Sequence, residues 1–411
     1  MKRSGFLALL CAAAIMLAGC GSSESSSQTA DNNKPADSGS VSADQTTSQG
    51  NSDSVAYVRD PKYVETKDYP SLKELYKDQF LMGCAVSNRV MSTPEFSELV
   101  LEQFNSFTAE NEMKPDAVLD RETAVSDPAA YKEHVPIKTA SLKTCLDYCQ
   151  NNGLKVRGHT LVWHSQTPEW FFSVDFDPKK GNVDRDTMLK RMENYIKDVL
   201  EWTESNYPGL IYAWDVVNEA ASDSMGMRKE SKWYETVGED FVAKAFEYAR
   251  KYAGKDVKLF YNDYNAYQVR KQNDIIKFLK PIAEAGNLDG VGMQSHIGLY
   301  LNAKTFMSAV KRYVKELGDI EIHITELDIG KDSSQNWEEK QKNLYCDFFK
   351  GLMELKAEGI RITSVTIWGL TDGMSWRMKE RPLLFNQNLS CKPAFDGIVE
   401  AIKPAEADAA A

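Results

Sequence analysis

The chain has 411 residues, of which 60 are acidic and 49 are basic, so its formal net charge is −11. This balance argues against nucleic acid as a partner, because a polyanion would be repelled, and it favours a neutral or mildly acidic ligand. Two of the seven cysteines lie in the first twenty residues. The other five are an odd number and cannot form a fully paired set of disulfides.

The first twenty residues have the pattern of an export signal that ends in a lipidated cysteine. Lys2 and Arg3 precede an apolar run over residues 6–18, which is too short to cross a bilayer as a helix but is typical of a signal peptide. The run leads to Leu-Ala-Gly-Cys, which resembles the lipobox of bacterial lipoproteins. We therefore expect residues 1–19 to be a lipoprotein signal peptide. Cys20 would then carry the lipid that anchors the exported protein to a bacterial membrane. An ordinary signal peptide with a chance cysteine is the alternative.

The next part of the chain changes composition sharply. Residues 21–54 are mostly Ser, Gln, Thr, Asn, Asp and Gly and contain no aromatic residue, so they cannot bury enough apolar surface to fold. We expect a polar, disordered tether over residues 20–56. Aromatic residues, Leu and Ile then recur, which predicts one folded domain over residues 57–405 and a flexible tail over 406–411. About 350 residues suit a (β/α)₈ barrel with long loops.

Strand and helix patterns alternate through this domain. Apolar, β-branched runs that end in polar or aromatic residues predict eight strands, at residues 80–87, 104–111, 155–163, 211–219, 258–265, 290–297, 321–329 and 364–370. Apolar residues three or four apart predict helices at 138–150, 186–204, 233–252, 271–284, 303–317 and 337–357. This alternation predicts an α/β protein, a closed (β/α)₈ TIM barrel. A doubly wound open sheet is the alternative, but no Gly-rich phosphate turn follows the first strand.

Two of the predicted strands end in glutamates. The fourth ends in Trp-Asp-Val-Val-Asn-Glu at Glu219, and the seventh contains Ile-Thr-Glu-Leu-Asp, with Glu326 at its centre. In a (β/α)₈ barrel the C-terminal strand ends converge on one cleft. Glycoside hydrolysis needs two carboxyl groups placed in this way. An ion pair at the barrel rim is the structural alternative for either residue alone.

Side-chain alternation predicts a network around the second glutamate. Residues two apart on a strand share a face, so Glu326 and Asp328 both point inward. On the sixth strand Gln294 and His296 share a face and approach the same space. We therefore expect His296 to hydrogen-bond Glu326 and to be held in one tautomer by Asp328. A single histidine such as His296, taken alone, is more often a core residue than a catalytic one.

Several long motifs in the domain resemble one known family. They are FTAENEMK at 107–114, RGHTLVWHSQ at 157–166, WDVVNE at 214–219, YNDYN at 261–265, GMQSH at 292–296, ITELD at 324–328 and TIWGLTDGMSWR at 366–377. Over nearly all of residues 57–402 the chain resembles glycoside hydrolase family 10, the endo-β-1,4-xylanases. The resemblance implies that Glu219 is the acid/base and Glu326 the nucleophile of a retaining mechanism. It also implies that Asn218 hydrogen-bonds the 2-hydroxyl of the sugar in the −1 subsite.

Other polar and aromatic residues at the strand ends predict a sugar-binding cleft. The resemblance places Glu110, Asn111 and Lys114 on the glycone side, where an ion pair at a helix start is the alternative. His159 and Trp163 share the inward face of the third strand, and Gln166 follows in the loop. Gln294 faces the same space. Flat apolar faces suited to pyranose rings come from Trp368 and Trp376.

Two positions depart from the family pattern. Pro115 stands where many members have tryptophan, which leaves the shape of the distal glycone subsites open, and Asn386 stands where aspartate is common. We expect a monomeric enzyme acting on xylan and xylo-oligosaccharides without metal or cofactor, because the carboxyl groups carry the chemistry. A retaining β-1,4-glucanase on the same barrel is one alternative. A lipid-anchored glycan-binding protein without activity is the other.

Overall fold

The computed structural model describes residues 69–403, so the predicted signal peptide, Cys20, the tether and the tail lie outside the described residues. In this range no helix is both long and apolar enough to cross a membrane. Five cysteines of the described part, at positions 84, 145, 149, 346 and 391, are buried free thiols.

The strands form a closed parallel barrel. Their bounds are β1 (Leu81–Val86), β2 (Ser106–Ala109), β3 (Lys155–Trp163), β4 (Ile211–Asn218), β5 (Lys258–Asp263), β6 (Gly290–Met293), β7 (His296–Gly298), β8 (Glu321–Gly330) and β9 (Ile362–Ile367). They pair in the order β6-β5-β4-β3-β2-β1-β9-β8-β7, and an additional pairing of β6 with β8 closes the ring. The predicted (β/α)₈ barrel is confirmed.

The sixth predicted strand is interrupted, which corrects the expectation of one continuous strand over 290–297. It consists of β6 and β7, both paired with β8 and separated by Gln294 and Ser295. Ser295 has a φ of 68°, a left-handed conformation that cannot continue a strand. Its hydroxyl donates to the Met293 carbonyl at 2.9 Å, and its own carbonyl accepts from Asp328 N at 3.3 Å. The break therefore lies at the strand end that faces the predicted site.

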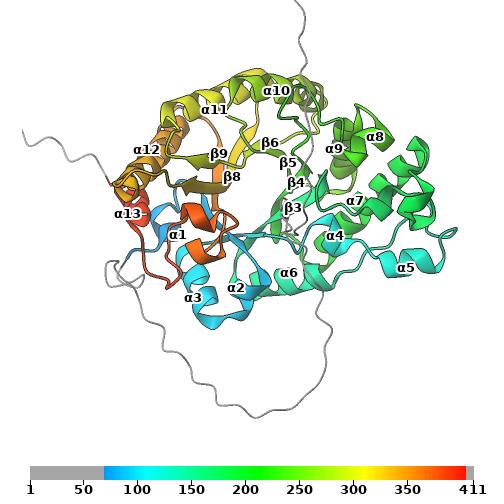
Figure 1. Cartoon of the computed structure of the whole chain (residues 1–411), viewed down its shortest axis with the longest axis horizontal. Helices are drawn as coiled ribbons and strands as arrows, with labels where there is room; N and C mark the ends of the chain where they lie inside the picture. Colours follow the sequence, from blue (N-terminus) through cyan, green and yellow to red (C-terminus); the bar gives the residue numbers. More distant parts are fainter. Residues whose placement is uncertain (1–68, 404–411) are drawn as a thin grey trace, which may run out of the picture. The chain divides into compact units, whose positions relative to one another are not determined.

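Helices surround the strands (Figure 1). Those before β3 are α1 (Leu72–Leu75), α2 (Asn88–Ser92), α3 (Pro94–Gln103), α4 (Pro115–Val118), α5 (Arg121–Ser126) and α6 (Ala140–Asn152). They are followed by α7 (Arg185–Asn206), α8 (Lys232–Val237), α9 (Phe241–Tyr252), α10 (Val269–Glu284), α11 (Ala303–Leu317), α12 (Trp337–Ala357) and α13 (Pro393–Ala401). Short 3₁₀ turns lie at Glu169–Phe172, Val174–Phe176, Pro178–Lys180, Asp372–Met374 and Met378–Glu380.

One predicted helix, 233–252, is in fact two. Gly238 ends α8 with a φ of 103°, which is open to glycine but strained for other residues. The Gly238 amide still donates to the Tyr234 carbonyl at 2.9 Å. The apolar spacing continues across this break, and for that reason periodicity alone merges α8 with α9.

A buried ion pair fills the barrel interior beneath the predicted site. Arg157 on β3 bonds both carboxylate oxygens of Asp215 on β4, and both side chains are at most 1% exposed. Arg157 Nε also donates to His323 Nδ1 at 3.2 Å. The next residue, Gly158, allows β3 to lie close to Trp214, because a Cβ atom at position 158 would be only 2.3 Å from the Trp214 ring. The RGH run at 157–159 is thus dictated by packing as well as by chemistry.

Candidate active site

The C-terminal ends of the strands surround a cavity of about 660 Å³. All the predicted site residues except Asp328 line it: Glu110, Asn111, Lys114, His159, Trp163, Gln166, Asn218, Glu219, Gln294, His296, Glu326, Trp368 and Trp376. Asp328 is fully buried and lies behind His296. The cavity is also lined by Tyr264, Asn265, Tyr300 and Arg377, which the sequence analysis gave no role.

Glu219 directly follows β4 and has a φ of 57°. Its amide donates to the Asn262 carbonyl at 2.9 Å, which ties this left-handed residue to the neighbouring strand β5. Its carboxyl group accepts from Trp163 Nε1 and from Gln294 Nε2, both at 2.9 Å. Both donors are neutral. His164 Nδ1 lies 3.9 Å away, and burial lowers the pKa of that imidazole although Glu219 opposes the shift.

Glu326 lies at an irregularity of β8. From Ile324 to Asp328, β8 contains one residue more than the paired stretch of β6 and β7, which runs from Met293 to His296. It also contains one residue more than the stretch of β9 that pairs with it. Such a bulge redirects side chains and is common beside active sites. The Glu326 carboxylate, 4% exposed, accepts from Asn262 Nδ2 at 2.7 Å and from His296 Nε2 at 3.1 Å. Burial alone would raise the pKa of Glu326, but the His296 hydrogen bond and its other partners lower it.

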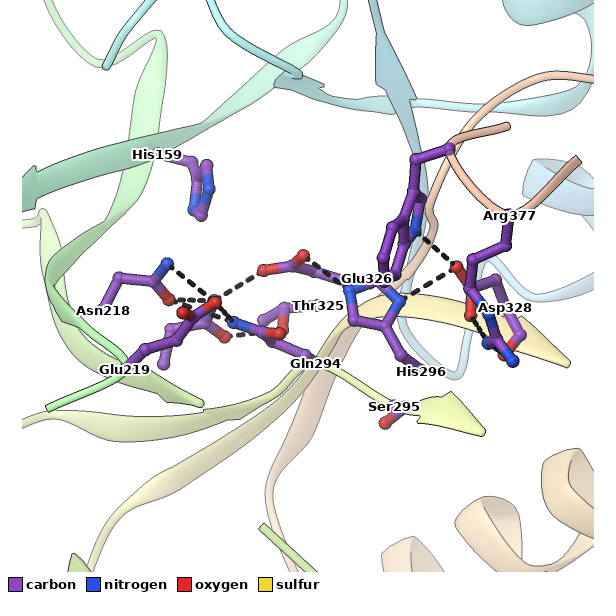
Figure 2. A network of polar contacts seen from close by, with 12 residues as sticks. His159, Asn218, Glu219, Gln294, Ser295, His296, Thr325, Glu326, Asp328 and Arg377 are labelled. Carbon is purple, nitrogen blue, oxygen red and sulfur yellow. Dashed lines mark hydrogen bonds and ion pairs between the residues drawn. The ribbon is translucent and has the colours of Figure 1, made fainter. Parts of the chain in front are cut away.

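His296 bridges Glu326 and Asp328, as the alternation of side chains predicted (Figure 2). Its Nδ1 lies 2.9 Å from an Asp328 oxygen. Burial would lower the pKa of His296, but the charge of Asp328 and the hydrogen bonds to both carboxylates outweigh burial and raise it to about 10. At neutral pH the ring is therefore an imidazolium that donates from both nitrogens.

Three amide side chains join the two glutamates. Asn262 and Gln294 use their amide nitrogens on Glu326 and Glu219, and both also donate to Asn218 Oδ1, at 3.0 and 3.1 Å. The opposite orientation of the Asn218 amide would place its nitrogen against these two NH₂ groups. Its oxygen therefore faces them, and its NH₂ group lies 3.4 Å from Glu219 Oε1.

Asn262 was missed as a site residue, although it lies in the YNDYN motif at the end of β5. Its oxygen accepts from Thr325 Oγ1 at 2.6 Å, which fixes its nitrogen toward Glu326. The available signal was its position at a strand end beside a neighbouring strand that carries a glutamate.

Asp328 is held by two residues of the segment after β9. Trp376 Nε1 donates to it at 3.1 Å and Arg377 Nη1 at 2.5 Å. Arg377 Nη1 also donates to the Ile297 carbonyl at 3.0 Å. Trp376 is 67% exposed, so its ring is available at the cavity rim while its N–H is used on Asp328.

The predicted glycone-side residues form a second polar group. Lys114 Nζ donates to Asn111 Oδ1 at 3.1 Å and to Gln166 Oε1 at 2.8 Å, and it lies 4.8 Å from the Trp163 ring. Burial lowers the pKa of Lys114, although four carboxyl groups oppose this shift. Burial and the charge of Glu112 raise the pKa of Glu110 to about 7, with Lys114 opposing.

His159 is fixed from below, because its Nδ1 lies 2.9 Å from an oxygen of Asp215, the partner of Arg157. Its ring meets Trp368 edge to face at 5.4 Å. In residues 69–403 no group of three His, Cys, Asp or Glu side chains could hold a metal ion. The chemistry available here comes from two carboxyl groups with contrasting surroundings. A (β/α)₈ barrel that presents such a pair at its strand ends has the architecture of a glycoside hydrolase.

Comparison with known proteins agrees with this class. The sequence profile of glycosyl hydrolase family 10 matches residues 71–401. Endo-1,4-beta-xylanase B of Butyrivibrio fibrisolvens is 41% identical over 340 residues, which are 80% of this chain and 53% of that protein. Endo-1,4-beta-xylanase A of Thermotoga maritima is 38% identical over 366 residues, 84% of this chain and 33% of that protein. The chain thus spans about half or less of these curated relatives.

Two solved structures are also similar. One contains the CBM22 and family 10 modules of a Clostridium thermocellum endo-1,4-beta-D-xylanase with xylohexaose: TM-score 0.75, 34% identity, 81% of this chain and 68% of that one. The other is an intracellular xylanase of Thermoanaerobacterium saccharolyticum, as a mutant with xylotetraose: TM-score 0.72, 35% identity, 80% of this chain and 98% of that one. The chain belongs to glycosyl hydrolase family 10.

The contrast between His296 and His323 gives a pH prediction. With a pKa of about 10 in the fold and about 6.5 in the unfolded chain, His296 stabilises the fold fully below pH 6.5, and this contribution is lost as pH rises through about 10. His323 has its pKa lowered well below 6.5 by burial and by Arg157. In an NMR titration of the five histidines, assigned through single His→Gln variants, His296 should stay protonated at pH 9 and His323 neutral at pH 6. A midpoint near 6.5 for His296 would contradict the network.

Proposed function

We propose that this chain is an endo-1,4-β-xylanase that hydrolyses xylan with retention of configuration, using Glu219 as acid/base and Glu326 as nucleophile. One observation carries the assignment of roles. The imidazolium of His296 and the amide of Asn262 both donate to Glu326, which favours a permanent carboxylate. The donors on Glu219, which are Trp163, Gln294 and the more distant Asn218 amide, are all neutral, so Glu219 lacks the cationic hydrogen-bond partner that Glu326 has.

The first step follows from these surroundings. Glu219 protonates the glycosidic oxygen while a Glu326 oxygen attacks the anomeric carbon, so the leaving sugar departs with the proton and a glycosyl ester forms on Glu326. That ester removes the negative charge of Glu326. Glu219, now ionised, takes a proton from water, and the water oxygen displaces Glu326 from the anomeric carbon. The configuration is inverted twice and is therefore retained.

The polar residues around the glutamates fit a sugar chain that passes on both sides of them. Lys114 and Gln166 follow β2 and β3, whereas Tyr264 and Tyr300 follow β5 and β7 on the other side of the barrel. The Asn218 NH₂ group, held by its neighbours next to Glu219, suits the 2-hydroxyl of the −1 sugar. Binding on both sides of the cleaved bond supports internal cleavage. The xylan specificity itself is supported by the names of the relatives and by the xylo-oligosaccharides in the two solved structures.

Removal of the nucleophile tests this function. Glu326→Ala should lower reducing-sugar release from xylan by about 10⁴-fold or more, because the covalent step is lost. The matched control is Glu321→Ala, on the same strand at the opposite end of the barrel, which should retain most activity. Circular dichroism should show that both variants are folded.

The choice of substrates separates the alternatives in the same assay. Cleavage of a mixed-linkage β-glucan with xylan left intact would make the chain a β-1,4-glucanase. Binding of xylo-oligosaccharides without cleavage of either polymer would support a glycan-binding protein. Rapid xylan cleavage by Glu326→Ala would refute the assigned nucleophile.

We also propose that the chain is exported and anchored through a lipid on Cys20, which the charged start, the apolar run over residues 6–18 and the lipobox-like ending support. Expressed in a bacterium, the protein should incorporate a radiolabelled fatty acid and sediment with membranes. Cys20→Ala should lose the label. A labelled Cys20→Ala protein, or an unlabelled wild type, would contradict the proposal.

A further inference from the structure

The segment between β9 and α13 carries two residues that hold Asp328 in place. Trp376 and Arg377 both donate to Asp328, and Figure 2 shows Arg377 beyond Asp328 as seen from His296. Asp328 in turn accepts from His296, which donates to Glu326. The position of the Trp376–Arg377 turn is therefore transmitted to the carboxylate of Glu326 through three successive hydrogen-bonded contacts, from the turn to Asp328, from Asp328 to His296 and from His296 to Glu326.

The second half of this segment, at residues 380–383, runs beside the end of β8. The amides of Ile329 and Lys331 donate to the carbonyls of Pro382 and Glu380, at 3.1 and 2.8 Å. From α12, Gln341 Nε2 donates to the Arg381 carbonyl at 2.9 Å, and the Tyr345 hydroxyl donates to the Pro382 carbonyl at 2.7 Å. Three of these donors are buried, so this half is fixed to the barrel.

Lys392, just before α13, joins the two halves. Its side chain is fully buried, and Nζ donates to the Arg381 and Leu383 carbonyls, both at 2.7 Å. Its third partner is the Asp372 carboxylate, which lies 2.8 Å away and belongs to the first half of the segment, before Trp376. Asp372 Oδ1 also accepts from Leu383 N at 2.8 Å. Two hydrogen bonds and one ion pair of the ammonium thus close the turn that carries Trp376 and Arg377.

The charge environment shows that this ammonium is costly to bury. Burial lowers the pKa of Lys392 to about 8, opposed first by Asp372, while Arg381 adds to the lowering and Glu338 opposes it. A buried charge is retained where its geometry satisfies every hydrogen bond. Here the ammonium is compensated by hydrogen bonds to two loop carbonyls and by an ion pair with one loop carboxylate, and none of these partners belongs to the barrel strands.

We propose that Lys392 is a positioning residue for the hydrolysis: it clamps the turn that holds Trp376 and Arg377 against Asp328, and thereby orients His296 and Glu326. This inference rests on the proposed function. Lys392 does not line the cavity and touches no reacting atom, so its effect must pass through the turn, chiefly through Arg377, whose guanidinium makes the charged contact with Asp328.

A double-mutant cycle distinguishes this role from general stabilisation. Lys392→Met keeps the length of the side chain and removes the ammonium, and it should lower kcat/KM on xylotetraose by about tenfold, the scale of one charge-assisted hydrogen bond. Because the effect passes through Arg377, Lys392→Met should lower kcat/KM by less than about twofold when it is added to the Arg377→Met variant. Rates are measured well below the unfolding temperature of each variant.

Arg191 offers a matched control. It is a buried cation that also donates to loop carbonyls, those of Lys132, Phe171 and Ser173, but on a different loop. Any decrease in kcat/KM that Arg191→Met causes should be the same factor in the wild type and in the Arg377→Met variant. If Lys392→Met also lowers kcat/KM by the same factor in the wild type and in the Arg377→Met variant, the proposal is wrong. It is also wrong if Lys392→Met is folded and fully active.

A second variant and a second readout protect the test. If Lys392→Met does not fold, Asp372→Asn weakens the same clamp with little change in volume and enters the same cycle. In addition, the His296 ring resonances should shift in Lys392→Met in the same direction as in Arg377→Met, and should be unmoved in Arg191→Met. This readout needs no turnover, so a wild type that fails to cleave xylan would refute the proposed function without deciding the role of Lys392. Unmoved His296 resonances in Lys392→Met would refute that role.

Discussion

The hydrogen bond between the His296 imidazolium and the Glu326 carboxylate is the interaction on which the rest of the site depends. A carboxylate that is 4% exposed loses most of its hydration, and without a partner its neutral form would be favoured. The structure meets this cost with alternating charges that run outward from the cavity: Glu326, His296, Asp328, Arg377 and Glu380, each bonded to the next. Every buried charge in this series has an opposite charge on either side, except Glu326, whose other side faces the cavity.

The same series explains the geometry of the strands. A continuous sixth strand and a regular β8 would keep one register throughout. The break at Ser295 and the extra residue in β8 shift that register by one before His296 meets Asp328. The local loss of ladder hydrogen bonds is offset by the bonds that His296 makes to both carboxylates. Glu219 shows the same principle, since its left-handed backbone is tied to Asn262.

The sequence predicts the barrel and the inner site well, because both depend on short-range patterns. Alternation along β8 was sufficient to place Glu326 and Asp328 near His296, and the strand ends were sufficient to gather the cavity residues. Prediction from the sequence failed where contacts between distant parts of the chain determine the local structure or the site. The apolar spacing of 233–252 continues through Gly238, whose backbone ends the helix. Asn262 and Arg377 were missed as site residues because a single asparagine or arginine gives no periodic signal, and their partners lie 64 and 49 residues away in the chain.

In the proposed mechanism Glu326 is an ionised nucleophile that forms a covalent bond with the sugar. Incubation with a 2-deoxy-2-fluoro-xylobioside that bears a good leaving group should trap this species, because the fluorine slows both formation and hydrolysis of the ester, whereas the good leaving group speeds only its formation. Intact-mass spectrometry and peptide mapping should then find one fluoroxylobiosyl group per chain, on the peptide that contains Glu326. An adduct on another residue, or turnover of unmodified substrate with inversion and no adduct, would contradict the account.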